Sequence, residues 1–149
     1  MVKSKNNTGR NKGFSLLELL IVVAIILIIA TIAIPSLLRS RQAANESAAV
    51  ASVRTITTAE VTYLSSSGGR FGALANLQTA GLVDNSFPNK GGYTYSITVN
   101  GTGTDYTIAA YPSSTNNGRY GYYSIPDGVI RYSTDTNYAP TGQTGNPVQ

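Results

Sequence analysis

A long apolar segment near the N-terminus constrains this chain more than any other feature. Residues 14–34 contain only three polar residues, Ser15, Glu18 and Thr31, and Pro35 follows directly. As a helix, these twenty-one residues extend about 31 Å, which is enough to cross a hydrocarbon core about 30 Å thick. The segment therefore predicts a membrane-spanning helix.

The single carboxylate inside this segment, Glu18, needs an explanation. A carboxylate within a bilayer costs on the order of 3 kcal/mol unless another group compensates it. Lys12 and Gly13 stand directly before the segment, so that Glu18 lies five residues after the glycine. Glycine, Phe14, carboxylate and apolar run thus form an ordered motif, and the carboxylate is expected to meet a partner charge.

The segment GFSLLE at residues 13–18, with a basic leader before it and Pro35 after it, resembles the start of a type IV prepilin of the short-leader class. This resemblance implies that a membrane peptidase cleaves after Gly13 and that the new N-terminal residue, Phe14, is N-methylated. It also implies that Glu18 pairs charges in the filament core and that Pro35 breaks the helix. The resemblance covers roughly residues 1–65, and the leader of thirteen residues is somewhat long for the class.

Other kinds of N-terminal segment fit less well. A secretory signal peptide has an apolar region of about 7–15 residues followed by a small-residue cleavage site. Here the run is longer and is followed by PSLLRSR at residues 35–41. A lipoprotein is excluded because the chain has no cysteine to acylate. An uncleaved signal anchor, with Glu18 tolerated near the membrane surface, remains open.

The formal charge of +4 lies in the predicted leader, residues 1–13. Four of the eleven basic residues and none of the seven acidic residues fall there, so seven of each remain after it. Basic residues beside a membrane segment favour the cytoplasmic side, which predicts a cytoplasmic leader. A nucleic-acid-binding domain would carry its basic patch on the folded part, so no direct nucleic-acid binding is expected.

The helix is expected to continue beyond Pro35, where the lost backbone hydrogen bond should bend or loosen the preceding turn. Residues 14–35 form its hydrophobic half and residues 36–66 its amphipathic half. The amphipathic half places apolar side chains at helical spacing, and SSSGG at 65–69 ends it. The apolar face consists of Ala49, Val53, Ile56, Ala59 and Tyr63.

The remainder predicts a small antiparallel sheet. Residues 67–92 form a connection with a short helix near 74–81. From Tyr93 the apolar period becomes two, which indicates strands. The expected strands are 93–99, 106–111, 119–125 and 129–132, within a sheet region 93–133, and residues 134–149 form an irregular tail. The fold class is therefore α+β, a long helical spine packed on a four-stranded antiparallel sheet, which the pilin resemblance also implies.

Residues suited to catalysis are scarce. The chain has no histidine or cysteine, so the common nucleophile–base pairs and soft metal sites cannot be built. Asp127 and Asp135 could join backbone carbonyls around calcium, although turn aspartates more often form turns. The ten tyrosines, nine of them after residue 90, are expected to be sheet packing and surface. We expect no enzyme activity, no cofactor and no metal.

These features together predict a structural subunit of a type IV pilus. Its precursor would lie in the inner membrane, and the processed chain would form an extracellular homo-oligomeric helical filament for adhesion or twitching motility. Its partners would be the prepilin peptidase and methyltransferase and the pilus assembly machinery. Two alternatives remain, a pseudopilin of a type II secretion system and a membrane-anchored binding domain.

Overall fold

The computed structural model describes residues 13–135 and 144–148. They fall into two compact units that divide between Leu37 and Leu38. The predicted leader, apart from Gly13, lies outside the described residues, and so does most of the predicted tail.

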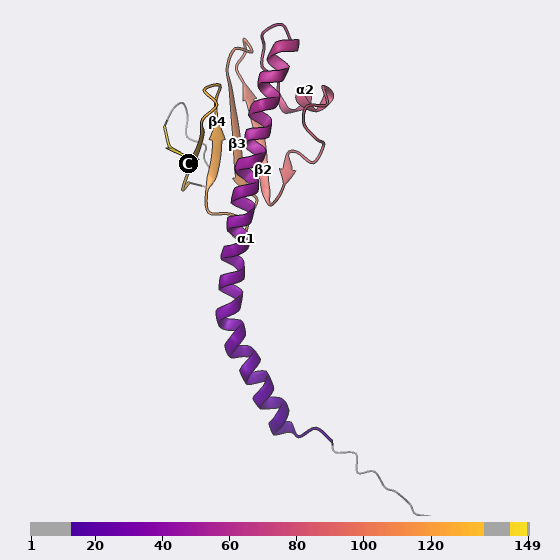
Figure 1. The fold of residues 1–149 in the computed structure, drawn as a ribbon, viewed down its shortest axis with the longest axis vertical. Coiled ribbons are helices and arrows are strands. Elements are labelled where there is room, and N and C mark those ends of the chain that lie inside the picture. The colour runs from indigo at the N-terminus through magenta and orange to yellow at the C-terminus, as the bar shows by residue number, and fades with distance from the viewer. Residues whose placement is uncertain (1–12, 136–143, 149) are drawn as a thin grey trace, which may run out of the picture. The chain divides into compact units, whose positions relative to one another are not determined.

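One long helix, α1, accounts for the predicted spine and runs from Leu16 to Ser66 (Figure 1). It is assigned as α-helix on both sides of Pro35. In the turn before the proline, the Thr31 hydroxyl donates a hydrogen bond of 2.7 Å to the carbonyl of Ile28. The helix break predicted at Pro35 concerns the assembled filament and stays a prediction.

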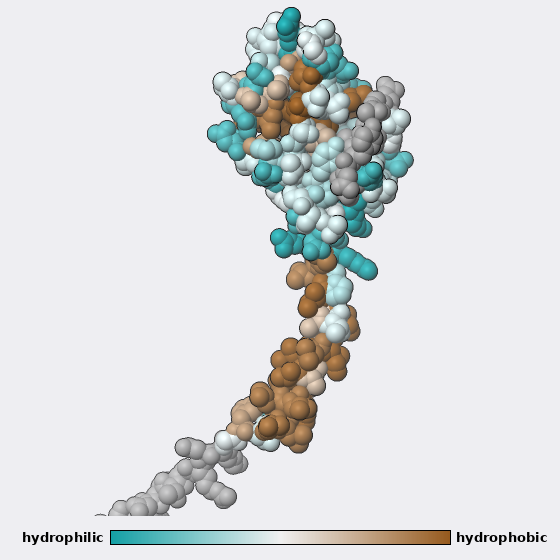
Figure 2. All heavy atoms as spheres, turned by 180° about the vertical axis from the view of Figure 1, so that it is seen from behind, coloured by the Kyte–Doolittle hydropathy of each residue, from teal (hydrophilic) through white to brown (hydrophobic). Residues whose placement is uncertain are grey.

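The first unit consists of the apolar part of α1 with its short N-terminal approach. From Gly13 to Leu37 every residue except Ala30 is exposed. Figure 2 shows this part of the helix as an almost continuous hydrophobic surface. Within the described part of the chain, α1 is the one helix that is long and apolar enough to cross a membrane.

The second unit contains a six-stranded antiparallel sheet whose strands follow one another in chain order. The strands are β1 (Asn89–Lys90), β2 (Tyr93–Val99), β3 (Tyr106–Pro112), β4 (Gly121–Ser124), β5 (Ile130–Ser133) and β6 (Asn146–Pro147). The four predicted strands correspond to β2–β5, so the predicted meander is confirmed. The predicted count of four strands was wrong, because β1 and β6 have two residues each and are too short to show an alternating pattern.

A short helix, α2 (Leu74–Thr79), lies in the connection between α1 and the sheet. Gly81 follows it with φ +70°, a left-handed conformation that glycine adopts without strain. Leu77 of this helix is fully buried. The connection between α1 and the sheet therefore also contributes to the core.

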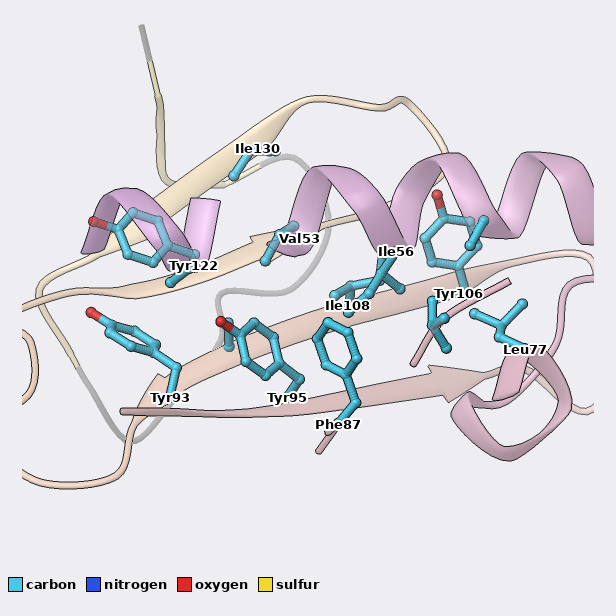
Figure 3. Close-up of a cluster of buried hydrophobic side chains, with 14 residues drawn as sticks. Val53, Ile56, Leu77, Phe87, Tyr93, Tyr95, Tyr106, Ile108, Tyr122 and Ile130 are labelled. Carbon is cyan, nitrogen blue, oxygen red and sulfur yellow. The ribbon is translucent and has the colours of Figure 1, made fainter. Parts of the chain in front are cut away.

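The core lies between the amphipathic part of α1 and one face of the sheet (Figure 3). Ala49, Val53, Ile56 and Ala59 of α1 are buried, as their helical spacing predicted. Most of the sheet's contribution is aromatic, and two of its contacts are edge to face, Phe71 with Tyr106 and Phe87 with Tyr95. The buried tyrosines are Tyr93, Tyr95, Tyr106, Tyr122 and Tyr123. The tyrosine-rich composition thus serves mainly as packing.

Candidate assembly and processing segment

The predicted cleavage site lies in an open part of the chain. Gly13 has no contact within 4 Å of the position that a Cβ would occupy. Phe14 is 78% exposed. The helical hydrogen bonds begin just after these residues, where the Leu19 N–H donates to the Ser15 carbonyl at 3.1 Å. The bond between Gly13 and Phe14 is therefore accessible and precedes the rigid helix.

Glu18 lies in the first turn of α1 and is exposed. A negative charge there interacts favourably with the helix dipole, by about 0.3–1 kcal/mol. That is less than the cost of burying the charge in a membrane, which is on the order of 3 kcal/mol. The three ion pairs among the described residues all lie in the second unit and do not include Glu18. The helix dipole alone therefore does not account for a carboxylate at this position.

A second acidic residue of α1, Glu46, has a role that the sequence did not reveal. Its side chain is 8% exposed and accepts hydrogen bonds from Arg119, from the backbone N–H at 2.8 Å, Nε at 3.1 Å and Nη2 at 2.9 Å. The neighbouring Asn45 donates to the Asn117 carbonyl at 3.0 Å, and Gln42 to the Thr115 carbonyl at 2.9 Å. Polar side chains of three α1 residues thus hold the β3–β4 loop against the spine.

Glu60 is the other buried acid of α1, with no exposed surface. Its Oε2 accepts a hydrogen bond of 3.0 Å from the Gly72 N–H. Burial raises the pKa of Glu60, and the bond from Gly72 opposes this effect. A Cβ at Gly72 would lie 2.7 Å from the Tyr63 ring, so any other residue there would require that ring or the loop to shift.

Helical spacing could have identified both buried acids. Glu46 and Glu60 share the face of Ala49, Val53 and Ile56, which the sequence assigned to the core. Charged residues are usually exposed unless they are paired, so burial of these acids requires partners. Neither partner is close in sequence. Arg119 is 73 residues from Glu46, and Gly72 is 12 from Glu60.

The two aspartates considered for calcium lie in or after the β4–β5 turn region and have protein partners. Asp127 accepts a hydrogen bond from the Val129 N–H at 2.9 Å and pairs with Arg131 at 2.5 Å. The Arg131 guanidinium holds the pKa of Asp127 below its ordinary value. The Asp135 N–H donates to the Ser133 hydroxyl at 3.1 Å. Among residues 13–135 and 144–148, no three acidic, histidine or cysteine side chains gather in a way that could hold a metal.

Comparisons with known proteins concern the same N-terminal segment. The family model for the prokaryotic N-terminal methylation motif matches residues 8–34. The type IV major pilin protein PilA of Myxococcus xanthus is 43% identical over 56 residues, which are 38% of this chain and 26% of that protein. The type IV wide pilus major component PilA4 of Thermus thermophilus is 55% identical over 40 residues, 27% of this chain and 30% of that protein. No solved structure matches.

The fold and the motif define a class, that of chains whose long N-terminal helix begins within a prokaryotic N-terminal methylation motif. Both relatives are type IV pilus proteins, and the matched motif includes residues 13–18, which confirms the resemblance drawn from that segment. The match spans less than a third of the length of either relative.

Proposed function

We propose that this chain is a structural subunit of a type IV pilus, polymerised through α1 into a surface filament that serves adhesion or motility. The observation that carries the proposal is the first unit, a methylation-motif helix exposed along almost its entire length with Glu18 as its one carboxylate. Apolar side chains on every side of a helix need apolar surroundings. A bilayer before assembly and neighbouring helices after assembly would supply them. Pilin subunits of this kind are structural and not enzymes.

Processing and location follow from the same segment. The precursor would lie in the inner membrane with its basic leader in the cytoplasm, as the charge distribution favours. The peptidase would cut after Gly13, the methyltransferase would modify Phe14, and the pilus assembly machinery would move the mature chain into an extracellular filament. The accessibility of Gly13 and Phe14 supports cleavage and methylation at these residues.

Glu18 would neutralise the ammonium group of Phe14 on a neighbouring subunit. Cleavage creates that ammonium group, so the partner charge exists only in the processed chain. Coulomb attraction is much stronger where apolar helices exclude water, and it would offset much of the cost of burying both charges. Such a pair would also set the axial position of each incoming subunit.

The turns around residues 27–35 would be partly unwound in the filament. Pro35 has no N–H to donate to the carbonyl four residues earlier, so this stretch is the weakest part of the helix. Neighbouring helices would shield the released backbone groups. A filament map with unbroken α-helical density through residue 35 would contradict this part of the proposal.

Sheared filaments provide the most direct test of the function. Electron microscopy should show thin filaments in the sheared fraction, and mass spectrometry should find in them a chain that begins at methylated Phe14. A membrane-anchored binding domain would stay with the membrane fraction after shearing. A secretion pseudopilin would yield no surface filaments when expressed at its native level.

Processing has its own test in Gly13→Leu. A bulky residue before the cut should prevent cleavage, so that uncut precursor accumulates in the membrane. Gly101→Leu serves as a control, since Gly101 has equally open surroundings and no left-handed backbone, but lies between β2 and β3. Purified filaments whose chains begin at Met1 would overturn the assigned site.

A further inference from the structure

A hollow of about 580 Å³ lies where β4, β5 and β6 meet. Tyr122, Tyr132 and Asn146 pair directly across the three strands, so they form one row on one face of the sheet. The volume falls within the range of small-molecule sites. The lining residues are Tyr120, Tyr122, Tyr132, Asn146, Pro147 and Val148.

The aromatic wall of the hollow is held in place before any ligand arrives. The Tyr120 and Tyr132 rings contact edge to face, with centroids 5.2 Å apart and an interplanar angle of 71°. The Tyr120 carbonyl accepts a 2.9 Å hydrogen bond from the Tyr93 hydroxyl. The Arg119 guanidinium lies 5.1 Å above the Tyr120 ring and is itself bound by Glu46. Little side-chain order therefore has to be created on binding, which favours affinity.

The lining combines flat apolar rings with uncharged polar groups. Tyr120 and Tyr132 are partly exposed and can offer aromatic surface with a hydroxyl at its edge, whereas Tyr122 is mostly buried. Asn146 adds an amide that can donate and accept. Among the residues that the structure describes, none that lines the hollow carries a charge. Burial raises the pKa of Tyr122 to about 12, so its hydroxyl stays protonated at neutral pH.

We propose that this hollow binds a neutral saccharide of one or two sugar rings. A pyranose has one face of C–H bonds that packs against an aromatic ring and a rim of hydroxyls that pair with phenol and amide groups. A charged ligand would give up its hydration without meeting an opposite charge in the lining. A purely apolar ligand would leave the hydroxyls and the amide without partners.

The binding test uses the full-length chain as single molecules in dodecylphosphocholine micelles, because a detergent with a sugar headgroup would compete. The probes are cellobiose, maltose and di-N-acetylchitobiose. The chain has no tryptophan, so tyrosine fluorescence reports binding without a stronger background. At least one disaccharide should give a saturable change, and Asn146→Ala should weaken that binding by about tenfold or more.

Substitutions that should leave the sheet folded separate an effect on binding from an effect on folding. Asn146 is exposed, so its replacement should not unfold the sheet, and Tyr132→Phe keeps the ring while removing a hydroxyl. Both should weaken binding. Tyr111→Phe is the matched control, since Tyr111 follows Ala110, the β3 partner of Tyr122, and so belongs to the opposite face. It should bind as the unmodified chain does.

Three results would overturn the saccharide site. One is no saturable binding of any of the three disaccharides at about 20 mM, well above a millimolar dissociation constant. Another is unchanged binding in both Asn146→Ala and Tyr132→Phe. The third is tighter binding of an apolar aromatic probe such as naphthalene than of any of the three sugars. Because single chains are measured, none of these results bears on filament formation.

Discussion

The two parts of α1 are stabilised by different partners, although they belong to one helix. In the second unit the helix buries one face against its own chain, with Ala49, Val53 and Ile56 fully covered. In the first unit the side chains of Ile25, Ile28 and Leu37 are 53%, 65% and 70% exposed. The amphipathic part thus completes a fold, whereas the apolar part leaves its hydrophobic surface for something outside the chain.

The same contrast holds for acidic residues. Glu46 and Glu60 each meet a donor from another part of the second unit, Arg119 and Gly72 respectively. Glu18 lies among exposed apolar residues, and the ion pairs of the described structure do not include it. The two buried acids thus have partners within the second unit. For Glu18 we expect a partner that belongs to another subunit.

Glu18→Ala should give the largest effect. The variant should insert into the membrane more easily, by about 3 kcal/mol, and should still be cleaved. Filament yield should nevertheless fall about a hundredfold or more, because a buried ammonium without its counter-charge costs several kcal/mol. The measurement compares cleaved chain with sheared filament. Glu18→Asp is the control, since it keeps the charge, and abundant normal filaments from Glu18→Ala would contradict the mechanism.

A pair of isoleucine substitutions tests the contrast directly. Ile56→Ala should lower the free energy of unfolding of the second unit by about 2–5 kcal/mol, because it leaves a cavity in the core. Ile28→Ala removes the same atoms from the first unit and should leave that stability unchanged. Thermal unfolding of the full chain in micelles, followed by near-UV circular dichroism of the tyrosines, measures both. Equal losses of unfolding free energy in the two variants would contradict the contrast between the buried and the exposed part of α1.

These cases also indicate how far the sequence could predict the molecule. Alternation between polar and apolar residues was enough to locate β2 and β3, because each has seven residues and every second one at its start is buried. The same reasoning missed β1 and β6, since two residues show no period. Pairing between Glu46 and Arg119 depends on how the sheet brings the β3–β4 loop to the spine, which no local pattern encodes.

The residues of the candidate assembly and processing segment were predictable for a different reason than the strands were. Gly13, Phe14 and Glu18 were identified from an ordered motif, and the matching family model covers all three. Their roles stay predictions, because the chemistry needs a peptidase, a methyltransferase and a second subunit. A single chain can establish only that the residues are accessible, as Gly13 and Phe14 are.

Glu46→Ala should destabilise the second unit by about 1.5–3 kcal/mol, the range for hydrogen bonds to a charged group. Arg119 is 54% exposed and can be rehydrated, so the loss should lie toward the lower end. The β3–β4 loop should exchange its amide hydrogens faster, which hydrogen exchange measures residue by residue. Lys90→Gln is the control, because it breaks the surface ion pair with Asp84 but leaves the hydrogen bond from the Ser86 N–H to Asp84, and it should change stability little. Unchanged exchange in the loop would contradict the proposed attachment.

The smallest expected effect concerns the pH dependence contributed by Glu60. Burial raises the pKa of Glu60 in the folded chain, so the folded state binds its proton more tightly than the unfolded state does. The stability contributed by this group is therefore greatest below the ordinary glutamate pKa of 4.5 and is lost as the pH rises through the folded pKa. Asp127 has the opposite sign, because Arg131 lowers its pKa and its contribution is lost in acid.

Glu60→Gln isolates the contribution of Glu60. Glutamine keeps a carbonyl oxygen for the Gly72 N–H and cannot ionise, so the variant should lose the decline in stability with rising pH. The unmodified chain should therefore lose stability between acidic and neutral pH relative to the variant, by about 1.4 kcal/mol for each unit by which the pKa is raised. Unfolding of the two chains across this pH range measures it. Parallel curves would show that Glu60 is ionised in the fold, and its burial would then require a partner charge, as we expect for Glu18.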